Sequence, residues 1–180
     1  MNANSFRIRL LPAFALPLML ASIAVASADQ SAVTAALEPA SARKLAPEFS
    51  LQDSSGKTAT LKDYRGRVVL LDFWATWCHG CKEEIPWFVD FHHKYEAKGL
   101  TVVGVSLDGD GWKVVKPFIA EKKVPYRILL GDDATAQRFG IENMPDTYLI
   151  DRQGRIAATY KGLVDKDNFE TNLRALLAQP

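Results

Sequence analysis

One stretch, residues 68–86, constrains this chain more than any other part of its sequence. It starts with seven almost continuously apolar residues, as expected for a strand that is buried on both faces of a sheet. The chain's only two cysteines, Cys78 and Cys81, follow shortly afterwards, and the residues after them have the apolar spacing of a helix. The stretch therefore predicts a central strand that leads through a short turn into a helix, with two thiols at the junction.

The spacing of the two cysteines favours a redox pair. Cys78 would lie at the helix N-terminus, where backbone N–H groups stabilise a thiolate, and Cys81 would lie one turn further in. We therefore expect Cys78 to be the exposed nucleophile and Cys81 the shielded resolving thiol. The pair can close a small disulfide, and no other cofactor is expected.

Two other uses of a cysteine pair fit the sequence less well. A structural disulfide stabilises a protein by closing a long loop in the unfolded chain, whereas this pair encloses only His79 and Gly80. Half of a zinc site would need further ligands, and the only other histidines, His92 and His93, come about three helical turns later. We therefore expect no metal site.

Beyond this stretch, the chain alternates strand and helix patterns, which predicts one α/β domain. The strand, helix and strand over residues 68–107 form a βαβ unit with parallel pairing. Strands are expected at residues 46–51, 58–61, 68–74, 100–107, 127–130, 148–151 and 155–160, and helices at residues 82–98, 112–123, 134–139 and after a cap at Asp165. Together these elements predict a three-layer sandwich with a mixed central sheet and an N-terminal β-hairpin.

The N-terminus has the pattern of an export signal. Arg7 and Arg9 precede an apolar run over residues 10–25, and small residues follow up to Ala28. We expect cleavage after Ala28 and export to the periplasm or another compartment outside the cytoplasm. The alternative is an uncleaved anchor, because a run of about 16 residues is close to the ~17–25 that span a bilayer.

A segment with little periodicity follows the signal. Residues 29–44 are rich in Ala and Ser, so we expect a flexible tether, with the folded domain at residues 45–180. A formal net charge of +1 gives no indication of nucleic-acid binding. Membrane contact is expected only if the N-terminal segment stays uncleaved, and we expect a monomer.

Together, these motifs resemble exported thiol-disulfide oxidoreductases of the TlpA/ResA type, which have the thioredoxin fold and belong to the redoxin group. The resemblance extends from about Leu45 to the C-terminus. The motifs that carry it are Ala46-Pro47 with Phe49, the run from Asp72 to Cys81 followed by Glu84 and Pro86, the run Met144-Pro145-Asp146-Thr147, and the run from Leu149 to Gly154.

Asp72 stands six residues before Cys78, within the apolar strand. A carboxyl group buried there has a raised pKa and can accept a proton from Cys81. The resemblance implies the same role, because thioredoxins have a buried aspartate at the matching position; the alternative is that strand alternation aims Asp72 at solvent. Glu84 matches the glutamate that TlpA/ResA-type proteins place near the dithiol, although an acid is also simply favourable in the first turn of a helix.

His79 and Gly80, between the cysteines, are expected to tune the redox potential. A protonated His79 favours the thiolate and makes the protein more oxidising, unless it is only a solvated turn residue. The resemblance implies that the bond between Met144 and Pro145 is cis, which exposes the backbone of Met144 to a substrate segment; a trans turn is the alternative. We expect Trp77 on the same docking surface.

The resemblance implies an enzyme that exchanges its dithiol with the disulfides of protein substrates, foremost as a reductant that a membrane electron donor recharges. Apocytochrome c is the first substrate class that it suggests. An oxidase or isomerase would use the same residues and remains open. A redoxin-type peroxidase is disfavoured, because Thr76 and the residues before it do not match the Pro-x-x-x-Thr-x-x-Cys loop, and a copper-delivery module is disfavoured because a wider C-x-x-x-C is absent.

Overall fold

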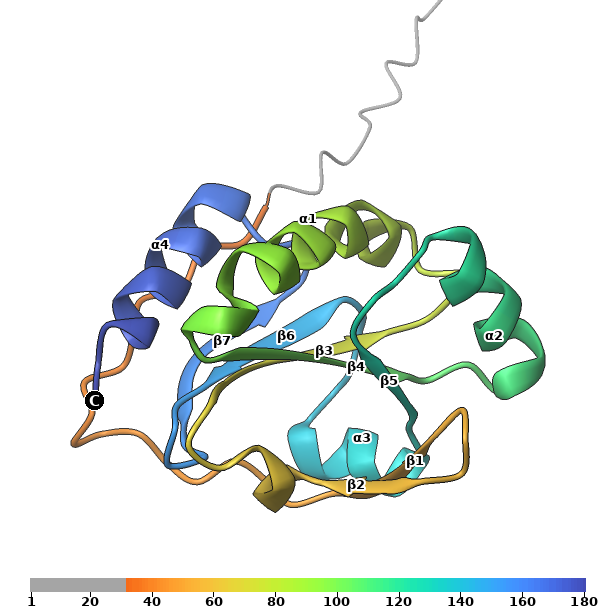
Figure 1. Ribbon diagram of the computed structural model, residues 1–180, viewed down its shortest axis with the longest axis horizontal. Helices are drawn as coiled ribbons and strands as arrows, with labels where there is room; N and C mark the ends of the chain where they lie inside the picture. The colour runs from red at the N-terminus through yellow and green to blue at the C-terminus, as the bar shows by residue number, and fades with distance from the viewer. Residues whose placement is uncertain (1–31) are drawn as a thin grey trace, which may run out of the picture.

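A mixed seven-stranded sheet forms the middle layer of the molecule (Figure 1). The computed structural model describes residues 32–180. The strand order is β2-β1-β5-β4-β3-β6-β7. The strands are β1 (Ser50–Asp53), β2 (Thr58–Thr60), β3 (Val68–Trp74), β4 (Leu100–Ser106), β5 (Arg127–Leu130), β6 (Asp146–Ile150) and β7 (Ile156–Lys161). The mixed sheet and the N-terminal hairpin of β1 and β2 confirm the predicted α/β fold class.

Within residues 32–180, four α-helices cover the two faces of this sheet (Figure 1). They are α1 (His79–Tyr95), α2 (Trp112–Glu121), α3 (Asp133–Phe139) and α4 (Lys166–Leu177). Residues of α1, α2 and α4 join one apolar core, whereas Phe139 of α3 belongs to the core on the opposite face. The predicted apolar spacing of α1 is confirmed, because Ile85, Phe88 and Phe91 are buried in the first of these cores.

Strand β3 lies inside the sheet and carries the chain to the two cysteines. It pairs in parallel with β4 and antiparallel with β6, and all of its residues are buried. Side chains alternate along a strand, so Leu71 and Phe73 face the core around α3 while Leu70 and Trp74 face the core around α1. Asp72 is two residues away from both Leu70 and Trp74, so its side chain lies on the same face of the sheet and points towards α1.

The structure differs from the expected flexible tether over the part of it that is described. The backbone N–H of Val33 donates to Leu163 at 2.7 Å, and that of Glu38 donates to Ala157 of β7 at 2.8 Å. Val33, Ala35 and Leu37 pack against the core. Residues 32–44 therefore lie against the domain, because alternate apolar side chains reach the core while the backbone covers the exposed edge of β7. The expected signal at residues 1–28 lies outside the described residues.

The first strand is also shorter than expected. β1 starts at Ser50 rather than at Ala46, and Pro47 has no backbone N–H with which to continue a ladder. Ala46 and Phe49 are nevertheless buried.

The predicted cap of α4 is confirmed, since Asp165 accepts a hydrogen bond from the backbone N–H of Asn168 at 2.8 Å.

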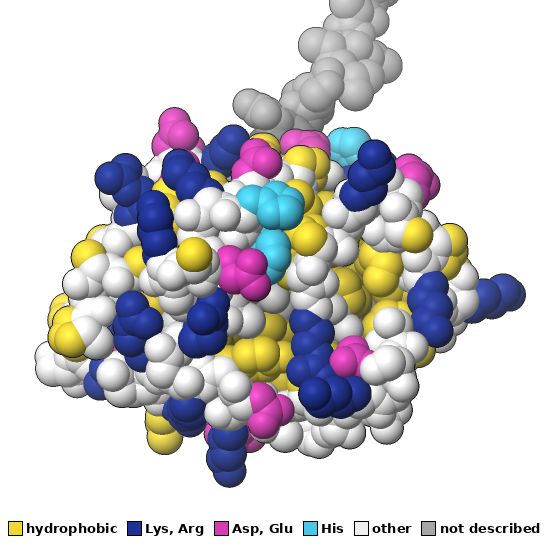
Figure 2. All heavy atoms as spheres, in the orientation of Figure 1, with side chains coloured by type: hydrophobic (Ala, Val, Ile, Leu, Met, Phe, Trp, Pro, Cys, Tyr) yellow, Lys and Arg dark blue, Asp and Glu magenta, His cyan; other side chains and the backbone are white. Residues whose placement is uncertain are grey.

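Charged side chains of both signs are spread over the face shown in Figure 2. This face therefore presents no single continuous basic or acidic area. Within residues 32–180, no helix combines the length and the apolar character needed to cross a bilayer.

Candidate active site

The dithiol lies at the junction between β3 and α1, as the sequence predicts. Cys78 is the N-cap residue of α1 and forms a disulfide with Cys81, with the two Cα atoms 5.3 Å apart. The backbone N–H of Cys81 donates to Sγ of Cys78 at 3.2 Å. A helix N-terminus favours negative charge on the atom that accepts its N–H groups. This geometry therefore favours the thiolate of Cys78 when the disulfide opens.

The expectation that Cys78 is exposed needs correction. Its relative exposure is only 5%, against 0% for Cys81. A neighbouring loop lies against the same helical turn: a Cβ atom added at Gly80 would lie 3.1 Å from Cδ of Pro145. A larger residue than glycine at this position would require the loop to shift by a few tenths of an ångström. Cys78 remains the more accessible thiol, but by a narrow margin.

The Met144–Pro145 peptide bond is cis, which confirms the resemblance on this point. Pro145 is buried and Met144 is partly buried against the core. The backbone carbonyl of Pro145 accepts a hydrogen bond from Gly162 at 2.9 Å, which fixes the loop to the end of β7. Two segments far apart in the sequence, the dithiol turn and the proline loop, therefore meet at one site.

Asp72 and Glu84 are both fully buried. Asp72 accepts one hydrogen bond, from the Thr147 hydroxyl at 3.4 Å, and Glu84 accepts one from the backbone N–H of Val164 at 2.7 Å. The second oxygen of each carboxyl group has no partner among the described residues. A solvent-facing Asp72 is therefore excluded. The alternative for Glu84, an acid in the first turn of the helix, is wrong because α1 begins at His79 and its first turn contains no acidic residue.

Burial changes the acidity of both groups. It raises the pKa of Asp72, against the lowering effect of the Thr147 hydroxyl. It also raises the pKa of Glu84, and the nearby charge of Asp72 raises it further. A buried carboxyl group with an unpartnered oxygen favours the protonated form. The site thus holds two carboxyl groups that can keep a proton near neutral pH, one on the strand beneath α1 and one a single turn beyond Cys81.

The sequence matches the family model described as "AhpC/TSA family" over residues 42–159. The chain belongs to this AhpC/TSA family. Among its relatives, the thiol-disulfide oxidoreductase ResA of Bacillus thuringiensis subsp. konkukian is 34% identical over 136 residues, which cover 74% of this chain and 77% of that protein. ResA of Oceanobacillus iheyensis is 35% identical over 139 residues, covering 74% and 72%.

Solved structures share the fold of this AhpC/TSA family member. The thioredoxin domain of a thiol-disulfide oxidoreductase from Bacteroides vulgatus has a TM-score of 0.67 at 28% identity, covering 74% of this chain and 96% of that one. A secreted thiol-disulfide isomerase from Corynebacterium glutamicum has a TM-score of 0.73 at 21% identity, covering 83% and 95%, and shows the shared fold alone. With the ResA relatives, the Cys78–Cys81 pair makes the protein a thiol-disulfide oxidoreductase of the ResA type.

Two further predicted site residues of this AhpC/TSA family member face solvent. The side chain of His79 is 90% exposed and lies 3.3 Å from the carboxylate of Glu83. Its charge, when it is protonated, is therefore surrounded by water and paired away from the dithiol. Trp77 is 67% exposed, as expected of a docking residue, although docking itself stays a prediction.

Asp108 is a site residue that the sequence pattern did not single out. Its carboxylate accepts from the Thr76 backbone N–H at 3.0 Å, from the Thr76 hydroxyl at 2.6 Å and from the Ser106 hydroxyl at 2.8 Å. These bonds fix the turn just before Cys78. Asp108 could have been found from the predicted parallel pairing of β3 and β4, because this pairing brings the residues that follow both strands to one edge of the sheet.

Asp146 is a second titratable residue of the site that the sequence pattern did not single out. It directly follows Pro145, is buried, and has one oxygen without a partner among the described residues. Burial raises the pKa of Asp146 to about 6, against the effect of Lys161, whose Nζ lies 3.9 Å away. The sequence feature that could have indicated this residue is a carboxylate at the start of a buried strand.

Within residues 32–180, no cluster of three or more His, Cys, Asp or Glu side chains could hold a metal ion.

Replacing Asp108 by asparagine is expected to destabilise the oxidised protein by about 1–2 kcal/mol, because one acceptor oxygen becomes a donor beside groups that now donate to it. Urea unfolding measures this difference. The matched control is Asp110→Asn, which removes the same charge from an exposed position two residues on. Equal effects of the two substitutions would show that the hydrogen bonds to Thr76 contribute nothing.

Proposed function

We propose that this oxidoreductase works outside the cytoplasm and reduces disulfides in other exported proteins. The observation that carries the direction is the pair of buried carboxyl groups, Asp72 and Glu84, beside the dithiol. Opening the disulfide creates thiol groups that ionise in the same buried region. An ionised Asp72 and the poor solvation of the site both oppose a thiolate there. They therefore favour the disulfide over the dithiol, which gives a low reduction potential and a reductant.

The opposite influence, from His79, is weak in this geometry. A cation favours a thiolate only where it lies close and poorly screened, and the ring of His79 is exposed and paired with Glu83. The helix N-terminus still favours the thiolate of Cys78 itself. We therefore propose that Cys78 is reactive as a thiolate, while the reduced Cys78–Cys81 pair as a whole gives up its electrons readily.

The proposed reaction has two exchange steps. The thiolate of Cys78 attacks a substrate disulfide, forms a mixed disulfide and releases the first substrate sulfur as a thiolate, which takes up a proton. Cys81 then gives its proton to Asp72 and attacks Sγ of Cys78, which releases the second substrate sulfur. Two electrons reach the substrate and the Cys78–Cys81 disulfide is left. The charge of Asp72 raises the pKa of Glu84, so Glu84 keeps its proton when Asp72 is ionised.

Substrate docking is proposed at the exposed Trp77 and at the loop of Met144 and Pro145. We propose that a substrate strand pairs with the backbone of Met144, which is only partly buried. Gly80 keeps this loop within van der Waals distance of the dithiol turn. The reacting sulfur would thus be held beside Cys78 by main-chain contacts that accept many substrate sequences.

Export is proposed from the N-terminal sequence, with cleavage after Ala28. The proposed partners are a membrane protein that returns electrons to the Cys78–Cys81 disulfide and oxidised apocytochrome c as the substrate, with the protein acting as a monomer. A direct test of the substrate uses the reduced protein with a disulfide-bonded Cys-x-x-Cys-His peptide. Faster reduction of this peptide than of insulin supports the cytochrome assignment, and equal rates contradict it.

The reduction potential decides between a reductant and an oxidase or isomerase. We expect a value near or below the roughly −270 mV of thioredoxin, measured by tryptophan fluorescence in dithiothreitol buffers. A value near the roughly −120 mV of DsbA would contradict the reductant. Asp72→Asn, which removes the carboxylate, should raise the potential by about 30 mV, whereas Asp90→Asn, which alters an exposed acid on α1, should leave it unchanged.

A further inference from the structure

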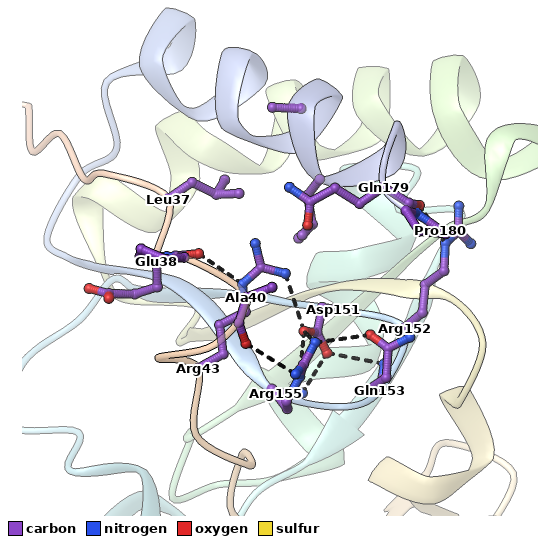
Figure 3. A pocket seen from close by; sticks show the side chains of 13 residues that line it. Leu37, Glu38, Ala40, Arg43, Asp151, Arg152, Gln153, Arg155, Gln179 and Pro180 are labelled. Carbon is purple, nitrogen blue, oxygen red and sulfur yellow. Dashed lines mark hydrogen bonds and ion pairs between the residues drawn. The ribbon is translucent and has the colours of Figure 1, made fainter.

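A second site lies at the end of the sheet opposite the dithiol. It is a cavity of about 610 Å³ between residues 37–43, the turn from β6 to β7 and the C-terminal end of α4 (Figure 3). Asp151 in this turn follows Ile150, which pairs with Val69 near the start of β3, whereas the dithiol follows the other end of that strand. The cavity is therefore separate from the redox site.

Three arginine side chains supply the positive charge of this cavity. Arg43 and Arg155 share a single carboxylate, that of Asp151, at 3.2 and 2.8 Å. The third, Arg152, donates to backbone carbonyl oxygens alone among the described residues. Two of the guanidinium groups therefore have one carboxylate between them, and the third has none.

One further carboxylate of the wall, that of Glu38, offsets part of this positive charge. Together with Asp151 it leaves the three arginines with an excess of one positive charge. Pro180 lies on the side of Arg152 in Figure 3. Net charge alone would therefore attract an anion only weakly. The kind of ligand that fits depends instead on which hydrogen-bond donors of the wall have no acceptor within the protein.

Arg43 has one edge of its guanidinium group free. Its Nε donates to the carbonyl of Glu38 at 2.9 Å and its Nη1 to Asp151, but Nη2 has no partner within residues 32–180. The side chains of Arg43 and Asp151 are each only 3% exposed. Figure 3 shows the guanidinium group of Arg43 in the cavity between Glu38 and Asp151. Nη2 itself is not fully buried, so it can be reached from the cavity and is free to donate to a ligand there.

The rest of the wall is largely apolar. Leu37, Ala40 and Leu176 line it. Its volume falls within the roughly 300–1,000 Å³ of sites for small molecules. An inorganic phosphate would need more free donors than this wall offers, whereas a carboxylate with a short carbon chain matches one free guanidinium edge beside apolar side chains.

We propose that this cavity binds a small aliphatic carboxylate. Its oxygens accept hydrogen bonds from Nη2 of Arg43, and its carbon chain packs against Leu37 and Leu176. Because the walls come from both residues 37–43 and the end of α4, the ligand fastens the N-terminal segment to the domain.

Thermal unfolding of the purified protein in sodium butyrate tests the proposal, with sodium chloride at equal ionic strength as the reference. We expect a saturable rise in the unfolding midpoint, of about 4 °C at a tenfold excess over the dissociation constant. Butyrate should also shift the NMR resonance of the Arg43 Nε–H group. Butylamine and inorganic phosphate should give neither effect, and saturable binding of phosphate alone would overturn the carboxylate assignment.

Two variants locate the binding site. Arg43→Gln removes the proposed donor, while Asp151 keeps its pair with Arg155. Ala175→Trp fills the cavity from an exposed position on α4 and removes no polar contact. Both should abolish the butyrate effect, and Arg65→Gln, which alters an arginine paired with Glu48 outside the cavity, should preserve it. No saturable effect in the wild type, or an effect that survives in Ala175→Trp, would overturn the proposal.

Discussion

Replacing Cys78 by serine is expected to abolish disulfide reduction, with a loss of at least about 1,000-fold in kcat/KM, because the thiolate at the N-terminus of α1 is the attacking group. A serine hydroxyl does not ionise in this pH range and cannot form the mixed disulfide. The measurement is reduction of insulin disulfides by the reduced protein, with the variant prepared in the same buffer. The same fold is expected, since the cysteine pair closes a loop of only two residues.

The companion variant, Cys81→Ala, should behave differently. Attack by Cys78 still occurs, but no second thiol resolves the mixed disulfide, so substrates stay covalently bound. These adducts are seen by non-reducing electrophoresis and disappear on addition of dithiothreitol. A Cys81→Ala protein that turns over normally, or a Cys78→Ser protein that forms the adducts instead, would reverse the assigned roles of the two thiols.

Asp72→Asn is expected to make the oxidised protein more stable at pH 8 by about 2 kcal/mol and to slow disulfide reduction at pH 7 at least about tenfold. Burial raises the pKa of Asp72 in the folded protein above that in the unfolded chain, about 4. Between these two values the folded state holds a proton that the unfolded state has lost. The free energy of unfolding therefore falls as pH rises through this window, and asparagine removes the loss.

Urea unfolding of both oxidised proteins at pH 4 and pH 8 checks this sign. The advantage of the variant should shrink at pH 4, where Asp72 is protonated in the folded state and about half protonated in the unfolded state. Asp90→Asn provides a control, because Asp90 is exposed on α1. A stability difference that does not depend on pH would mean that Asp72 does not titrate in this range.

Much of the site was predictable because its signals are local. The apolar run of β3, the cysteine spacing and the apolar positions of α1 each follow from a few adjacent residues. The cis bond before Pro145 and the pairing of its loop with the dithiol turn came from resemblance to a family. The burial of Asp72 was predictable because its neighbours on both sides along the strand are apolar. A strand that is buried on both faces leaves no exposed position for a single carboxyl group.

The missed features depend on contacts between distant residues. Asp108 reaches Thr76 only because β3 and β4 are adjacent, and no local pattern distinguishes it from Asp110. The small exposed fraction of Cys78 has no local signal either. The simple composition of residues 32–44 predicts a tether, but the exposed edge of β7 and the apolar surface beside α4 give this segment a place to pack.

This N-terminal segment also bears on where the chain can be shortened. Val33 forms a β-bridge with Val164, whose N–H is the single hydrogen-bond donor to Glu84 among the described residues. The carbonyl of Val33 accepts from Asp165, the cap of α4. An expression variant that starts at Leu45, the boundary expected from composition, would lose both contacts. The residues that hold a carboxyl group of the redox site in place therefore begin well before that boundary, and a shortened protein intended for redox work has to retain Val33.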